Sequence, residues 1–135
     1  MSSFRIFDIV GSALSAQSTR LNTVASNLAN ADSVGSTPEA AYKARMPVFQ
    51  AAPDQASPEA AGVRVLGVVE SQAEAQRRFE PGNPLADGDG YVYASNVNVV
   101  EEMTNMISAS RSYQSSIEVM NTAKDLAIRT LSLGK

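Results

Sequence analysis

The chain has 135 residues, a length typical of a single domain, and 44% of them are apolar although only 6% are aromatic. It contains no Cys and no His, which excludes a disulfide scaffold, a thiolate nucleophile, a Cys/His zinc site and a histidine acid–base catalyst. The net charge of −3 falls entirely within residues 33–96, so neither end is a basic arm and no nucleic-acid surface is indicated.

Residues 1–32 are predicted to form an N-terminal assembly helix. Apolar side chains recur there at alternating spacings of three and four residues, which is typical of the narrow seam of a coiled coil. The seam positions are Phe7, Val10, Leu14, Gln17, Leu21, Val24, Leu28 and Ala31. A helix over residues 4–31 would be about 42 Å long. Gly35 and Pro38 predict that the helix ends before them.

Residues 33–96 are predicted to form a small insert with long loops and short β-strands. Residues 51–61 are rich in Pro and Ala and show no periodicity, which predicts a loop. The abundance of valine predicts a strand over residues 62–69, and weaker strand patterns cover residues 76–79 and 91–93.

The run Asp87-Gly88-Asp89-Gly90 in this insert resembles part of a calcium-binding loop. With Gly90 at the sixth position of such a loop, the first and twelfth positions would be Leu85 and Asn96, where acidic residues are required. A Gly–Asp turn before a strand is therefore the favoured interpretation.

Residues 97–135 are predicted to form a C-terminal assembly helix that packs with the N-terminal one. Apolar residues recur every seven positions, at Val99, Met106, Tyr113, Met120 and Ala127. Two further series, each apolar at three of five positions, are Met103, Ser110, Ile117, Lys124, Leu131 and Val100, Ile107, Gln114, Asn121, Ile128. A stripe of this width needs a second neighbour besides one partner helix. The expected fold is mainly α, with the two terminal helices forming a coiled coil or bundle.

Two pairs of adjacent charged residues are candidates for functional sites. Glu101 and Glu102 would point about 100° apart on a helix, so they cannot converge as an acid–base pair and suit the first turn of a helix better. Arg77 and Arg78 fit either a solvated strand edge or an ionic contact to a neighbouring subunit. An enzyme with its site in the insert stays open only as a minor alternative, because the usual catalytic side chains are missing.

The C-terminal stripe predicts assembly with other chains. If the two helices pair only with each other, the surface around Val100, Ile107 and Ile128 stays exposed. Burying these three side chains at about 1.5–3 kcal/mol each would contribute several kcal/mol to association. Self-assembly or co-assembly is therefore expected.

Both ends of the chain resemble the flagellar basal-body rod proteins. Residues 20–22 (Arg-Leu-Asn) and 25–30 (Ala-Ser-Asn-Leu-Ala-Asn) are similar to the N-terminal signature of the rod and hook family. Residues 96–103 and 108–114 are similar to its C-terminal signature. The insert, with Gly62-Val63, Pro81-Gly82 and Gly90-Tyr91-Val92, resembles that of the proximal rod members.

This resemblance implies a structural protein that is not an enzyme. It would be a subunit of the proximal rod, self- and co-assembling through its terminal helices into a helical tube that transmits torque from motor to hook. The implied partners are other copies, other rod proteins and the flagellar type III export apparatus, without nucleic acid or direct membrane insertion. The implied location is the rod in the periplasmic space, reached without a cleaved signal peptide.

No cofactor, metal or catalytic residue is expected, and the candidate site is an assembly interface. Its predicted residues are Phe7, Val10, Leu14, Leu21, Asn22, Val24, Asn27, Leu28, Asn30, Val100, Met103, Met106, Ile107, Tyr113, Ile117, Met120 and Leu131. The alternative function is a soluble helical adaptor or export-chaperone-like protein that forms a small closed oligomer.

Overall fold

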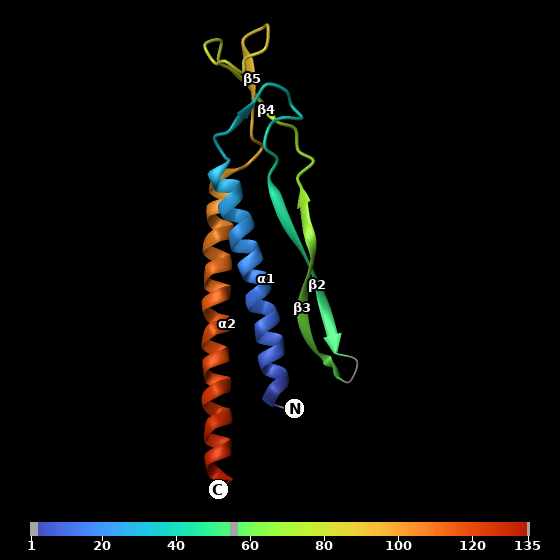
Figure 1. Cartoon of the computed structure of the whole chain (residues 1–135), viewed down its shortest axis with the longest axis vertical. Coiled ribbons are helices and arrows are strands. Elements are labelled where there is room, and N and C mark those ends of the chain that lie inside the picture. The colour runs from blue at the N-terminus through green and yellow to red at the C-terminus, as the bar shows by residue number, and fades with distance from the viewer. Residues whose placement is uncertain (1–2, 55–56, 135) are drawn as a thin grey trace.

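Two long helices and a long β-ribbon run along the molecule, and a small sheet lies at one end of them (Figure 1). The computed structural model describes residues 3–54 and 57–134. Helix α1 covers Ser3–Ala29 and helix α2 covers Val99–Leu133, and the two run antiparallel. Both terminal helices expected from the sequence are therefore present, with bounds within two residues of those predicted.

Helix α2 is capped at both of its ends. The Asn98 side chain accepts hydrogen bonds from the backbone N–H groups of Val100 and Glu101, at 3.1 and 3.2 Å. These contacts satisfy two of the donors that the first turn of a helix leaves without a partner. Gly134 follows the last helical residue as the C-cap, at the position where the sequence predicted the helix to stop.

The second structural unit is a two-stranded antiparallel ribbon. It is formed by β2 (Arg45–Asp54) and β3 (Ser57–Glu70), with Met46 opposite Val69 and Ala52 opposite Gly62. A bulge lies between Val48 and Phe49, where the register of the two strands shifts. The ribbon lies against α1, so that α1 is packed between α2 and the ribbon (Figure 1).

A small three-stranded sheet closes the end where the two helices meet. It contains β1 (Val34–Gly35), β5 (Tyr91–Ala94) and β4 (Gln76–Phe79) in this order, and all pairs are antiparallel. The central strand β5 carries Val92, which is fully buried. A side chain in place of Gly35 would put its Cβ 2.7 Å from the backbone of Ala40, so this end of β1 requires glycine.

The prediction of a mainly α fold with a small, loop-rich insert is wrong. The middle of the chain is built on two antiparallel sheets, and the ribbon strands alone have 10 and 14 residues. The strands predicted over residues 62–69, 76–79 and 91–93 are present.

The error arose at residues 51–61, which were predicted to be a loop. The structure continues β2 through residue 54 and begins β3 at residue 57, and residues 55 and 56 lie outside the described part of the chain. Pro47 and Pro53 lie within β2, and proline within a run of residues argues against a strand when only the sequence is known. Proline is tolerated there because each strand of a two-stranded sheet has a free edge that needs no N–H donor.

Candidate assembly interface

The two helices pack through a large apolar row on α1 and a row of small side chains on α2. Val10 and Val24 of α1 are buried, and the other large residues of the predicted seam are half-buried. The facing row of α2 has a spacing of seven residues and consists of Glu102, Ala109, Ser116 and Ala123, of which all except half-buried Ser116 are buried. Small side chains let the helices approach closely, and this leaves Met106, Tyr113 and Met120 half-buried beside the contact.

Sequence reasoning missed this row because alanine and serine give a weak hydrophobic signal. The large residues of α2 predicted one broad apolar stripe, whereas in the structure they form two separate groups. One part flanks the contact with α1, and the other part, with Val100, Met103 and Ile107, faces away from it. Val100 is 74% exposed and Ile107 is 54% exposed.

A buried amide joins α1, α2 and the start of the ribbon. The Asn27 side chain is fully buried, and its Nδ2 donates to the Arg45 carbonyl oxygen at 2.8 Å and to Glu102 Oε2 at 2.9 Å. Its Oδ1 accepts from the Tyr42 hydroxyl at 3.0 Å and from the Arg45 N–H at 2.9 Å. All four hydrogen-bonding positions of the amide are filled, so Asn27 is held in one orientation.

Glu102 brings a carboxylate into this buried cluster. Its other oxygen accepts from Asn105 Nδ2 at 3.5 Å, and Asn105 Oδ1 in turn accepts from the Arg20 guanidinium at 3.3 Å. The cation of Arg20 on α1 therefore lies one side chain away from the carboxylate of Glu102 on α2. This chain of contacts compensates part of the cost of burying the carboxylate.

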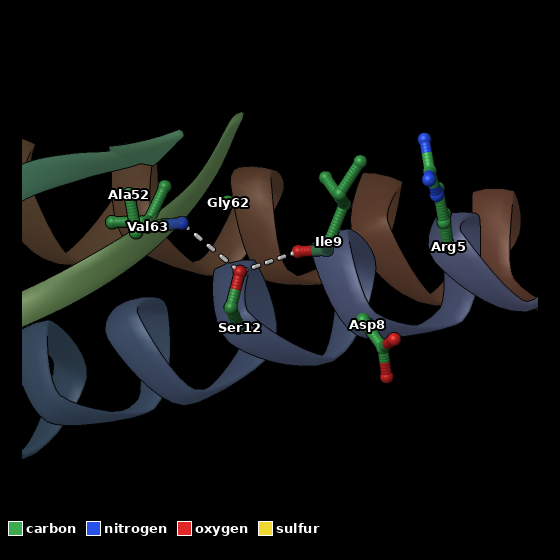
Figure 2. A pocket seen from close by; sticks show the side chains of 7 residues that line it. All are labelled: Arg5, Asp8, Ile9, Ser12, Ala52, Gly62 and Val63. Carbon is green, nitrogen blue, oxygen red and sulfur yellow. Dashed lines mark hydrogen bonds between the residues drawn. The ribbon is translucent and has the colours of Figure 1, made fainter. Parts of the chain in front are cut away.

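Near the N-terminal end of α1, Ser12 ties the helix to the ribbon (Figure 2). The Ser12 Oγ donates to the Ile9 carbonyl oxygen at 2.7 Å and accepts from the Val63 N–H at 3.0 Å. A Cβ at Gly62 would lie 2.9 Å from this Oγ, so glycine permits the close approach of β3.

A cavity of about 240 Å³ opens beside this contact. It is lined by Arg5, Asp8, Ile9, Ser12, Ala52, Gly62 and Val63. The lining combines one carboxylate, one guanidinium and one hydroxyl that is already used by the backbone, which is not a catalytic constellation.

The ribbon exposes large apolar side chains in the half that lies next to the small sheet. They are Met46, Val48, Phe49, Leu66, Val68 and Val69. A two-stranded ribbon is at best marginally stable alone, and this one is supported by α1 on part of its surface only. These side chains are therefore candidates for contact with another chain.

The arginines of β4 have partners within the chain. The Arg77 guanidinium lies 3.9 Å above the Tyr91 ring and within 4 Å of the carboxylates of Asp87 and Asp89. Arg78 Nε contacts Glu80 at 2.6 Å. These contacts explain the two arginines without a neighbouring subunit.

Asp87 acts as an anchor of the turn before β5. Its Oδ1 accepts from the N–H groups of Tyr91 and Asp89, at 2.9 and 3.0 Å, and the hydrogen bond from Tyr91 is the main cause that lowers the pKa of Asp87. Gly90 has a φ of 84°, which the turn requires and which favours glycine. Within residues 3–54 and 57–134, no cluster of three or more acidic, His or Cys side chains is arranged to hold a metal ion.

The residues predicted from sequence for the interface lie in three environments. Buried inside the chain are Val10, Val24 and Asn27. Half-buried are Phe7, Leu14, Leu21, Leu28, Asn30, Met106, Tyr113 and Met120, and exposed are Asn22, Val100, Met103, Ile107, Ile117 and Leu131. The exposed group is the one that remains available to another chain.

Two protein-family models match this sequence. Residues 7–36 match the model described as flagella basal body rod protein, and residues 89–133 match the one described as flagellar basal body rod FlgEFG protein C-terminal. The chain is also 57% identical to the flagellar basal-body rod protein FlgC of Salmonella typhimurium, 56% identical to that of Escherichia coli O6:H1 and 42% identical to that of Buchnera aphidicola subsp. Schizaphis graminum. In each case the match covers 100% of both chains.

Among the residues that the structure describes, no helix combines the length and the apolar character that crossing a membrane requires.

Proposed function

Because this chain belongs to the flagellar basal-body rod protein family and is a structural subunit of the rod, we propose that it enters the proximal rod through its terminal segments, residues 1–32 and 97–135. Residues 33–96, which form the ribbon and the small sheet, then lie beside these helices in the rod. As a rod subunit, the chain assembles with other flagellar rod components.

The observation that carries this proposal is the small amount of apolar surface that the chain buries by itself. Among the described residues, the buried apolar set contains only Ala and Val, whereas 19 large apolar residues are exposed. The accessible surface is 9075 Å². A compact monomer of 14.3 kDa would expose about 6,800 Å², so this chain exposes about 2,300 Å² more. An excess of this size is typical of a subunit that several neighbours cover.

The assembly that fits these surfaces is a tube of many copies and related rod subunits. Helices packed side by side in such a tube would each have several neighbours, which would cover the outer face of α2 with Val100, Met103 and Ile107. A tube joined by many apolar contacts can transmit the torque of the motor to the hook. The role is mechanical, and no catalytic step is part of it.

The small amount of apolar surface that the chain buries by itself also bears on how the chain reaches the rod. A chain that gains much of its apolar burial only from neighbours can stay unfolded until it reaches them. This property suits passage through the flagellar type III export apparatus without a cleaved signal peptide, followed by assembly in the periplasmic space.

The test is to place two carboxylates on the outer face of α2. In Val100→Asp/Ile107→Asp, both substituted side chains are exposed in the single chain, so its helical content should stay unchanged. Burying two carboxylates in a contact between subunits is costly, so we expect loss of the chain from purified basal bodies and loss of swimming in soft agar. The strain should express this chain as its only version of the rod protein.

The matched control is Asn121→Asp, which adds one carboxylate at an exposed polar position of the same helix. Because Asn121 follows Val100 and Ile107 at the same spacing of seven residues, a second control, Ser108→Asp/Ser115→Asp, adds two carboxylates at exposed polar positions outside this row. We expect the second control to be present in basal bodies at the level of the unmodified chain. Unmodified chain that is absent from basal bodies and forms a discrete oligomer in the cytosol would contradict the proposed function. Full swimming of the double variant would contradict the role of this face.

A further inference from the structure

We propose that the ribbon of one copy packs against the outer face of α2 in the next copy. This inference rests on the proposed rod function and names the surfaces through which one copy meets another. It concerns two sets of residues. The ribbon patch is Met46, Val48, Phe49, Leu66, Val68 and Val69, which cover both faces of the ribbon because Val68 and Val69 are consecutive in β3, and the helix patch is Val100, Met103 and Ile107.

The helix patch forms one stripe on the side of α2 that faces away from α1. Its residues are three and four positions apart, so they share one side of the helix. Ala109 is fully buried in the contact with α1 and lies nine positions after Val100. Nine positions correspond to a rotation of about 180° from Val100, on the opposite side of the helix.

The two patches begin at the same height along the molecule. The Asn27 amide holds both the Arg45 backbone, where β2 begins, and the Glu102 carboxylate, in the first turn of α2. Met46 follows Arg45 and pairs with Val69, whereas Val100 and Met103 flank Glu102. From this point β2 and α2 run in the same direction, away from the small sheet (Figure 1). Two copies placed side by side without an axial offset would therefore bring the ribbon patch of one opposite the helix patch of the other.

The order of α2, α1 and the ribbon determines whether the two copies meet through identical or through different surfaces. Helix α1 contacts both α2 and the ribbon and lies between them, so the two patches are on different sides of the chain (Figure 1). A contact between two different patches is heterologous and leaves one free patch at each end of a pair. Such a contact continues into a ring or a helical array instead of stopping at a dimer.

The available area and the number of patches point to a second copy as the partner. Each chain carries one ribbon patch and one helix patch, so every copy in a row can contact one neighbour through its ribbon patch and the other through its helix patch. One interface of standard size covers about 800 Å² on each partner. The total surface of this chain exceeds that of a compact monomer by about 2,300 Å², which is more than two such contacts would cover.

Cysteine cross-linking tests this contact, and the chain itself adds no other thiol because it contains no Cys. Tagged Leu66→Cys and untagged Ile107→Cys are expressed together in one strain, and purified basal bodies are oxidised. We expect a disulfide-linked dimer of one tagged and one untagged chain, at least tenfold more abundant than the dimer from either variant alone. A chain that carries both cysteines should give a ladder of higher oligomers.

The matched control pairs Leu66→Cys with Leu131→Cys, which lies on the same helix and is also exposed. It is 24 residues beyond Ile107, which corresponds to about 36 Å along the helix, so we expect at most a tenth of the cross-linked product. Dimers from Leu66→Cys alone, equal cross-linking of the control, or chains present in the rod without any cross-link would each overturn this inference alone. Absence of the unmodified chain from basal bodies would overturn the proposed function as well.

Discussion

At the scale of single residues, the buried amide of Asn27 connects α1, α2 and the start of the ribbon. The amide binds one backbone segment, one hydroxyl and one carboxylate, which come from residues 42–45 and from residue 102. Tyr42 is half-buried and Glu102 is buried, so these two partners have little access to water when Asn27 is replaced. The residue therefore fixes the geometry of the junction as well as its stability.

This role predicts the effect of Asn27→Asp, which keeps the shape and both acceptor contacts but removes both donors. The Arg45 carbonyl oxygen loses its donor, and a second carboxylate is placed within 2.9 Å of Glu102. We expect a loss of about 3 kcal/mol or more in the free energy of unfolding, measured with urea. Asn22→Asp, at an exposed position of the same helix, should change it by at most about 0.5 kcal/mol.

A second substitution shows whether the two carboxylates cause the loss. Glu102→Gln supplies a donor where the charge was, so Asn27→Asp/Glu102→Gln should recover a large part of the lost stability. If the double variant is as unstable as the sum of the two single variants predicts, the Asn27–Glu102 contact is not the cause.

At the scale of elements, the spacing between α1 and α2 is set by small residues. Ala109 is fully buried at the centre of this contact. Ala109→Leu adds three carbon atoms where there is no space, so we expect a loss of about 1–3 kcal/mol in the free energy of unfolding. Thermal unfolding followed by circular dichroism measures it. Ser108→Leu, one position earlier and exposed, is the control, and an equal loss in both variants would show that helix spacing is not the reason.

At the scale of the whole molecule, burial is unevenly distributed. Val92 and Ala94 of β5 and the side chains of Asn27 and Glu102 are buried, whereas Leu131 and Leu133 at the far end of α2 are 74% and 87% exposed. In the isolated chain we expect hydrogen exchange at the last turns of α2 to be at least tenfold faster than at β5. In basal bodies the last turns should become as protected as β5. Strong and uniform protection of the isolated chain would contradict a structure that depends on its neighbours.

The terminal helices could be predicted from the sequence because their apolar residues recur with a clear period. The seam on α1, from Phe7 to Leu28, gave both the helix and its packing side. The ribbon could not be predicted as a whole, since Pro47 and Pro53 interrupt β2 and the strand pairs with a partner that only the folded chain identifies. The contact side of α2 was missed because its row of Ala and Ser is less apolar than the rows beside it.

The bond between Asn27 and Glu102 spans 75 positions of the chain. A polypeptide that leaves a narrow conduit with its N-terminus first releases residue 27 long before residue 102. If the chain is exported in this way, the amide has no carboxylate partner until more than half of the remaining length has emerged. The junction would then close only after the start of α2 had arrived, and the length of the loop would slow its closure further.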